Sequence, residues 1–219
     1  MTERTLLTGL LRRLLSPTAF TACFLLVLVI VMALLAPWLG TSDPTQINPA
    51  SRLAPIGAEH WLGSDAFGRD IYSRVIYGAR VSIIVGLGAA SLSLLFGLFI
   101  GILAGYFRVF DAIIMRIMDG IMAIPSILLA ISLVALTGGS LLTVLVAIVI
   151  PEVPRVVRLV RGVILSIRHE PYVEAAVTLG TRTPRIIFRH IIPNTWAPLI
   201  VQGTYIFASA ILIESTLSF

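Results

Sequence analysis

The chain has 219 residues, of which 58% are hydrophobic and only 12% are charged, and its formal net charge is +5. Soluble proteins carry roughly 25% charged residues, so this composition excludes an ordinary soluble domain. All 16 basic residues are arginine. A phosphate-binding loop of the G-x-x-x-x-G-K-[ST] type needs a lysine, so the chain carries no such ATP site of its own.

Long uncharged runs predict membrane-spanning helices. A helix needs about 20 apolar residues to cross a hydrocarbon core of about 30 Å. The run from 120 to 151 is too long for one span, and its Thr-Gly-Gly-Ser stretch at 137–140 is typical of a reversal. The sequence therefore predicts an all-α, multi-pass helical membrane protein with spans at 18–39, 81–106, 119–137, 141–160 and 195–215.

The N-terminal segment resembles a secretory signal, because arginines precede an apolar run. The apolar part of a signal usually has about 7–15 residues, whereas this one extends from Thr18 to Leu35. We expect an uncleaved anchor that follows a cytoplasmic segment at 1–17. Cys23 has no second cysteine to pair with, and we interpret it as a small apolar helix residue.

The arginines are distributed unevenly between the two sides of the predicted spans. Only Arg52, Arg69 and Arg74 fall in the loop at 41–79, with Arg80 at its boundary, and most others fall in the alternate segments. Arginine is concentrated in cytoplasmic loops of membrane proteins. This asymmetry predicts a cytoplasmic N-terminus and an extracytoplasmic loop at 40–80.

That loop is rich in turn-forming residues, and the pattern after Asp70 predicts a short interfacial helix before the second span. His60, Asp65 and Asp70 are conceivable metal ligands, but their spacing matches no established pattern. We expect no metal site here. The favoured interpretation is a folded loop whose aspartates cap turns and pair with Arg69.

Two features of the spans point to packing and to a pathway. Gly97, Gly101 and Gly105 share one helix face, and small residues there allow a second helix to approach closely. Glu214 lies near the end of the last span. It either lines a pathway or is an interfacial acid that reaches toward water.

The charged stretch at 170–194 interrupts the apolar pattern. Glu170-Pro171 predicts a helix start, and Gly180 predicts its end. Thr183 is the expected N-cap of a second short helix that continues until Pro193 opens the final span. We expect two short helices at an angle on the cytoplasmic face, at about 165–192, whose small residues enter a groove on a soluble partner.

Two alternatives account for the same stretch. A DNA-reading helix-turn-helix would also combine small residues with a basic second helix, but this helix runs almost directly into a membrane span and has little freedom to enter a groove. We therefore expect no nucleic-acid binding. A basic loop that only fixes membrane topology is the second alternative, and composition alone does not exclude it.

The same stretch resembles a known motif. "EAAVTLG" followed by "HIIP" resembles the EAA motif, E-A-A-x3-G-x9-I-x-L-P, of importer-type ABC transporter permeases. The matching positions are Glu174, Ala175, Ala176, Gly180 and Pro193, whereas His190 and Ile192 depart from the motif. Residues 60–83, "HWLGSDAFGRDIYSRVIYGARVSI", and 214–219, "ESTLSF", resemble further patterns of the peptide/nickel branch, with Ser64 and Thr216 as variants.

The resemblance implies a plasma-membrane permease subunit, not an enzyme, that forms half of a pathway for peptides or a similar solute such as a nickel chelate or glutathione. Its implied partners are a second homologous permease, two ABC ATPase subunits that hold ATP and Mg²⁺, and an extracytoplasmic substrate-binding protein. The chain itself would bind no cofactor. The implied ATPase contacts are Glu174, Ala175, Ala176, Gly180 and Arg182, with His190 and Pro193 at the end of the coupling segment.

Members of this branch usually continue past Ser-Phe with a glycine-rich loop and a sixth span, which is missing from the 219 residues. The alternative function is an ATP-independent membrane carrier, or a scaffold whose basic loop binds anionic lipid. A carrier would normally show charges within the membrane or internal repeats, and neither is evident. The transported substrate does not follow from the sequence.

Overall fold

The computed structural model describes residues 17–217, which are mostly helical outside the loop before residue 71 and contain, within that range, no β-strand beyond an isolated bridge between Ser64 and Asp70. The predicted all-α class is therefore confirmed. The chain divides into two compact units, Met1–Ile83 and Ile84–Phe219. Residues 1–16 of the predicted cytoplasmic segment, with three of its arginines, lie outside the described residues, as do 218–219.

The first unit begins with α2 (Pro17–Leu34), continues through the short 3-10 turns η1 (Ala36–Trp38) and η2 (Pro49–Ser51), and ends within α3 (Ile71–Tyr106). Nearly every side chain of α2 is exposed, although the helix is apolar on all sides. A helix of that composition is suited to lipid contact. Its end at Leu34 is earlier than the predicted 39, because the chain tightens into η1 at Pro37.

The loop before α3 is organised by two carboxylates. Asp65 accepts bonds from the backbone N–H groups of Phe67 and Arg69 and pairs with the Arg69 side chain at 2.7 Å and with Arg74. Asp70 caps α3 by accepting from the backbone and hydroxyl of Ser73, and its other oxygen lies 3.1 Å from Nδ1 of His60. The aspartates thus act as turn caps and ion-pair partners, as the favoured interpretation of this loop held.

The expected interfacial helix is wrong as a separate element. α3 is one helix of 36 residues and passes without interruption from Ile71 through the predicted start of the second span at 81. At 1.5 Å per residue its length is about 54 Å, well beyond a hydrocarbon core of about 30 Å. The segment from 71 to 80 contains no proline, so nothing in the backbone ends the helix where the charges stop.

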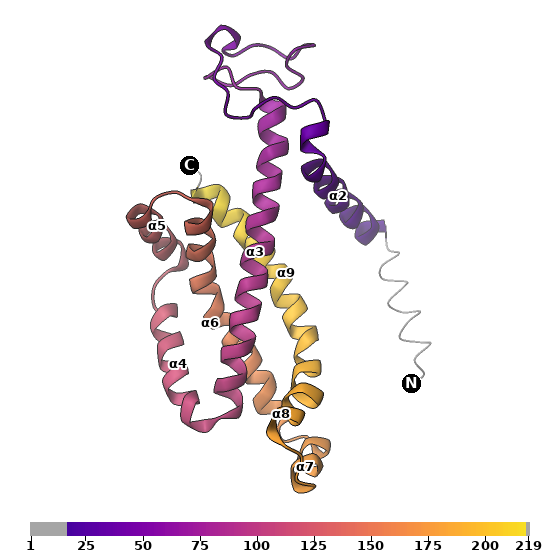
Figure 1. Ribbon diagram of the computed structural model, residues 1–219, viewed down its shortest axis with the longest axis vertical. Coiled ribbons are helices and arrows are strands. Elements are labelled where there is room, and N and C mark those ends of the chain that lie inside the picture. The colour runs from indigo at the N-terminus through magenta and orange to yellow at the C-terminus, as the bar shows by residue number, and fades with distance from the viewer. Residues whose placement is uncertain (1–16, 218–219) are drawn as a thin grey trace. The chain divides into compact units, whose positions relative to one another are not determined.

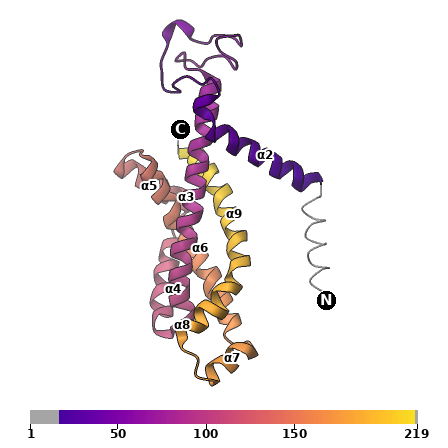
Figure 2. The same cartoon turned by 45° about the vertical axis from the view of Figure 1, so that its right-hand side comes forward.

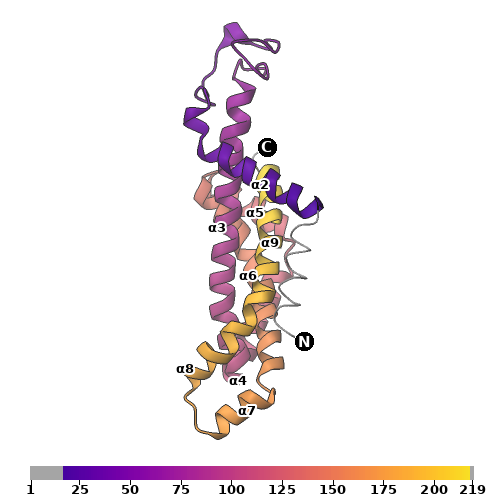
Figure 3. The same cartoon turned by 90° about the vertical axis from the view of Figure 1, so that its right-hand side faces the viewer.

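The second unit contains the rest of α3 and, within the described residues, six further α-helices. These are α4 (Arg108–Met122), α5 (Ser126–Thr137), α6 (Leu141–Ile167), α7 (Pro171–Thr178), α8 (Thr183–Ile186) and, after the π-helical turn η3 (Ile187–Ile191), α9 (Ile192–Leu217). α6 lies in the middle, with α4 and α5 on one side and α9 on the other (Figure 1). α7 lies at the end of this unit away from Leu217 (Figures 2 and 3).

The predicted span at 119–137 is wrong in its boundaries. The chain there forms two helices, α4 and α5, that bend by 81° at a break before Ser126. Pro125 explains the break, because a proline disfavours the helical conformation of the residue before it and lacks the N–H that a helix would use.

Among the described residues, three helices are long and apolar enough to cross a membrane, namely α2, α3 and the continuous helix Thr183–Leu217, and the bent pair α4–α5 would make a fourth. Five had been expected. α6 is long enough at 27 residues, but it carries four charged residues from its middle onward, Glu152, Arg155, Arg158 and Arg161. The multi-pass membrane class holds, whereas the predicted span at 141–160 is not among these helices.

The three glycines of α3 pack against α6 along one seam. A Cβ atom at Gly97 would lie 2.4 Å from Val156, one at Gly101 2.7 Å from Val160, and one at Gly105 2.9 Å from Ile164. Carbon atoms in contact are normally about 3.5–4.0 Å apart. Only glycine therefore allows the two backbones to approach as closely as they do.

Candidate functional site

α7 is the short helix at the free end of the second unit, and its sequence defines both of its ends. Glu170 is extended at the N-cap position, Pro171 occupies the first turn and Glu174 places a carboxylate near the positive helix end. At the other end the N–H of Gly180 bonds to Val177 and the N–H of Thr181 to Ala176. This pair of bonds is the Schellman motif, which requires the positive φ of +74° that Gly180 adopts.

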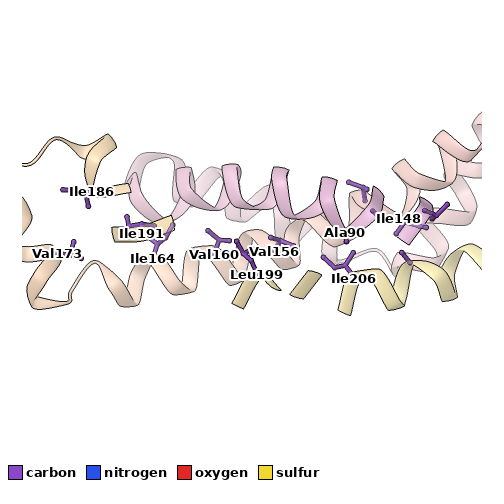
Figure 4. Packing of buried hydrophobic residues seen from close by; sticks show 14 residues of the cluster. Ala90, Ile148, Val156, Val160, Ile164, Val173, Ile186, Ile191, Leu199 and Ile206 are labelled. Carbon is purple, nitrogen blue, oxygen red and sulfur yellow. The ribbon is translucent and has the colours of Figure 1, made fainter. Parts of the chain in front are cut away.

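One side of α7 is anchored in the core of the second unit. Val173 is only 3% exposed and belongs to the same buried cluster as Ile164 of α6, Ile186 of α8 and Ile191 of η3 (Figure 4). Figure 4 shows these side chains between the ends of the long helices, in line with the seam residues Val156 and Val160. Ile164 belongs to α6, and Ile191 directly precedes α9. The packing of Val173 in this cluster therefore connects α7 to both long helices.

Polar contacts add a second connection between α7 and the start of α9. The rings of Tyr172 and His190 lie 5.7 Å apart, and Asn194 donates to the hydroxyl of Tyr172 at 3.4 Å and to the carbonyl of His190 at 2.6 Å. His190 therefore lies in the junction between α7 and α9. Pro193, in the first turn of α9, is exposed.

The opposite side of α7 is open. Glu174 and Ala175 are exposed, Ala176 is half-buried, and the apolar side chains of Val177 and Leu179 are 56% and 85% exposed. Exposed apolar side chains next to small residues and one carboxylate form a surface that a partner can cover closely. We call the exposed side chains of Glu174, Ala175, Val177 and Leu179 the α7 surface.

The remaining predicted residues lie apart from this surface to different degrees. Arg182 is the exposed N-cap of α8, so the expectation that Thr183 caps the second helix is wrong, since Thr183 is already its first residue and no side-chain cap forms. That second helix also does not end before the last span but continues through η3 into α9. Glu214 is half-buried near the far end of α9 and about 32 Å of helix away from Pro193.

The sequence reading missed two ion pairs between α4 and α6. Arg161 binds Asp111 through two parallel bonds of 2.5 and 2.7 Å, and Arg158 binds Asp119 at 2.6 Å. Arginines at 155, 158 and 161 recur every three residues, which places them close together on one side of a helix. That recurrence, with acids in the preceding amphipathic segment, is the signal that could have indicated the pairs.

No group of three metal-ligating side chains occurs within residues 17–217. The α7 surface is thus an exposed, partly apolar patch on a helix whose other side is buried through Val173 in the core of the second unit. It contains no constellation typical of a catalytic centre in the part of the chain that the structure describes.

Comparison with known proteins identifies the family. Residues 94–219 match the model of the binding-protein-dependent transport system inner membrane component, and residues 9–55 match the N-terminal TM domain of oligopeptide transport permease C. The chain belongs to this family of inner-membrane transport components. This membership sets aside the alternative of an unrelated carrier or scaffold.

Individual relatives agree with that assignment. The chain is 53% identical over 189 residues to a Sinorhizobium fredii protein named "Probable peptide ABC transporter permease protein". The aligned region is 86% of this chain and 65% of that relative. It is 48% identical over 191 residues to the dipeptide transport system permease protein of Alkalihalophilus pseudofirmus. The aligned region is 87% of this chain and 63% of that protein. The chain thus spans slightly less than two thirds of the length of these two relatives.

Proposed function

We propose that this chain is one of two permease subunits that together enclose a pathway for peptides, or for a similar small solute such as a nickel chelate or glutathione. The subunits are driven by ABC ATPases that dock on the α7 surface. The observation that carries this proposal is the contrast between the two sides of α7, one buried through Val173 and the other exposed at Val177 and Leu179. The relatives' names support the solute class.

The contrast matters because coupling needs both a contact and a stiff connection. An exposed helix that moved freely on its loops would absorb the motion of a partner. Protein interiors are densely packed, so they transmit a displacement rather than absorb it. A tilt imposed on the α7 surface would pass through Val173 and Ile186 to Ile164 of α6 and Ile191 at the base of α9.

The other components follow from what this chain lacks and from its charge. The absence of lysine leaves ATP and Mg²⁺ to two partner ATPase subunits. An extracytoplasmic binding protein would deliver the solute to the side of the 40–80 loop. The arginine asymmetry favours a cytoplasmic N-terminus in the inner membrane. The arginines on either side of α7, at 168, 182, 185 and 189, favour the cytoplasmic side for α7 as well, where the ATPases would lie. Glu214 is the acid proposed to face the pathway.

The experiment is solute uptake by cells or vesicles that contain the assembled transporter. Glu174→Arg combined with Ala175→Trp changes two exposed positions, so the variant should insert and accumulate normally. It should lose uptake because a reversed charge and a bulky ring prevent close docking. Glu59→Arg makes the same charge reversal at an exposed position of the outer loop and should transport normally. Normal uptake by the α7 double variant would reject the proposal.

A further inference from the structure

A pocket lies at the break between α4 and α5, beside α6. Its volume is about 280 Å³, enough for a small group of a solute. Two of its lining side chains are polar, the hydroxyl of Ser126 and the guanidinium of Arg155. The other principal walls are Ile121, Ile124, Pro125 and Pro151.

Arg155 is held in place from behind. Its Nη1 donates to Oε1 of Glu152 at 2.5 Å, and the Glu152 side chain is only 1% exposed whereas that of Arg155 is 38% exposed. Within the described residues, this is the one hydrogen bond that Arg155 makes. Arginine has five N–H donors in a planar fork, so several remain available on the side of the pocket.

Glu152 lies beside the seam between α3 and α6 and is buried there. The seam advances by four residues on each helix, from Gly97 with Val156 to Gly101 with Val160. One step earlier the same register brings Ser93, which is fully buried, to the level of Glu152. Glu152 therefore positions the guanidinium and is too deeply buried to contact a solute.

The start of α5 adds a second source of positive potential. Pro125 occupies the N-cap position and no side chain caps the helix, so the backbone N–H groups of the first turn have no acceptor within the helix. Such N–H groups and the helix dipole favour a negative group. The planar fork of arginine matches the two oxygens of a carboxylate.

We propose that this pocket binds the carboxylate of the transported solute, such as the C-terminal carboxylate of a peptide, with Arg155 as the specificity-determining residue and Glu152 as its positioning residue. The inference rests on the proposed transport function. It adds a recognition step within the permease itself, separate from the choice made by a binding protein. A lipid phosphate has related chemistry and is the competing occupant.

The test uses the reconstituted transporter with saturating binding protein and measures import by mass spectrometry. The probes are a mixture of di- and tripeptides with free C-termini and the same peptides with C-terminal amides. Arg155→Gln should lower import of the free acids about tenfold, the effect of one charge-assisted bond, and import of the amides less than twofold. Arg155→Lys keeps the charge but lacks the planar fork, so it should retain only part of the preference.

Arg158→Gln is the matched control, because Arg158 lies one turn further along α6, binds Asp119 and does not line the pocket. It should leave the ratio of free acids to amides unchanged. An equal effect of Arg155→Gln on both peptide classes would overturn the inference while leaving the proposed function intact. So would an effect that appears only when the vesicles contain phosphatidylglycerol, because the ligand would then be lipid phosphate. Failure of the unmodified transporter to import these peptides, a nickel chelate and glutathione alike would reject the proposed function instead.

Discussion

Replacing Gly97 by alanine tests the seam that joins α3 to α6. The added Cβ would lie 2.4 Å from both Cβ and Cγ1 of Val156, more than 1 Å inside an ordinary carbon contact of about 3.5–4.0 Å. The Val156 Cβ cannot rotate away because it is bonded to the backbone, so the helices must separate. Overpacking of a well-packed interior costs about 1–3 kcal/mol.

Alanine is also more favourable than glycine inside a helix by about 1 kcal/mol, and this gain in stability must be separated from the packing cost. Gly78→Ala supplies the control, because Gly78 lies in the same helix and has no atom within 4 Å of an added Cβ. Thermal unfolding in detergent, followed by circular dichroism, should show Gly97→Ala less stable than Gly78→Ala by about 1–3 kcal/mol. Equal stability of the two variants, within about 0.5 kcal/mol, would refute the close approach of α3 and α6.

Two further predictions concern the loop and α7. Burial of Asp65 raises its pKa. Hydrogen bonds from the N–H groups of Arg69 and Phe67 and from the Arg69 side chain lower the pKa by more than burial raises it, so the net shift is downward. Because the pKa of Asp65 is lower in the folded protein, its carboxylate stabilises the loop at pH values above the ordinary pKa of 3.8. This contribution is lost as the pH falls toward the lower pKa of the folded protein. The fluorescence of Trp61, with the other tryptophans replaced by phenylalanine, should report unfolding of the loop in acid. Asp65→Asn should weaken the dependence of this transition on pH below 4, while Asp70, whose pKa is also lowered, retains its own contribution. An unchanged acid transition would contradict the role of Asp65. Gly180→Ala should cost about 1 kcal/mol at the left-handed cap and speed amide exchange in α7, and unaltered exchange would show that the cap does not hold the helix.

The sequence was sufficient for the class of fold because helices in a bilayer need long apolar runs, and those runs are visible. Boundaries were less predictable. The charges at Arg74 and Arg80 suggested a separate interfacial helix, yet α3 continues because intrahelical hydrogen bonds do not depend on where charges lie. Pro125 did carry a local signal for the break between α4 and α5, and the apolar run around it concealed that signal.

Local chemistry also predicted most of α7. Pro171 in its first turn and Gly180 after its last follow from fixed backbone preferences, so both ends lie where the residues indicated. What pattern could not show was which side of α7 is buried, since that depends on Ile164 and Ile191, distant in sequence. The ion pair of Arg161 with Asp111 was missed for the same reason, because the partners are 50 residues apart.

The central claim is that the α7 surface is the contact for a partner ATPase, and site-specific photo-cross-linking in the assembled transporter tests it most directly. A photoreactive phenylalanine analogue replaces Leu179, which is 85% exposed on the α7 surface, or Leu136, which is 84% exposed at the end of α5. Illumination should join the ATPase to the chain at position 179 and not at position 136. No ATPase adduct at 179, or equal adducts at both positions, would contradict the account.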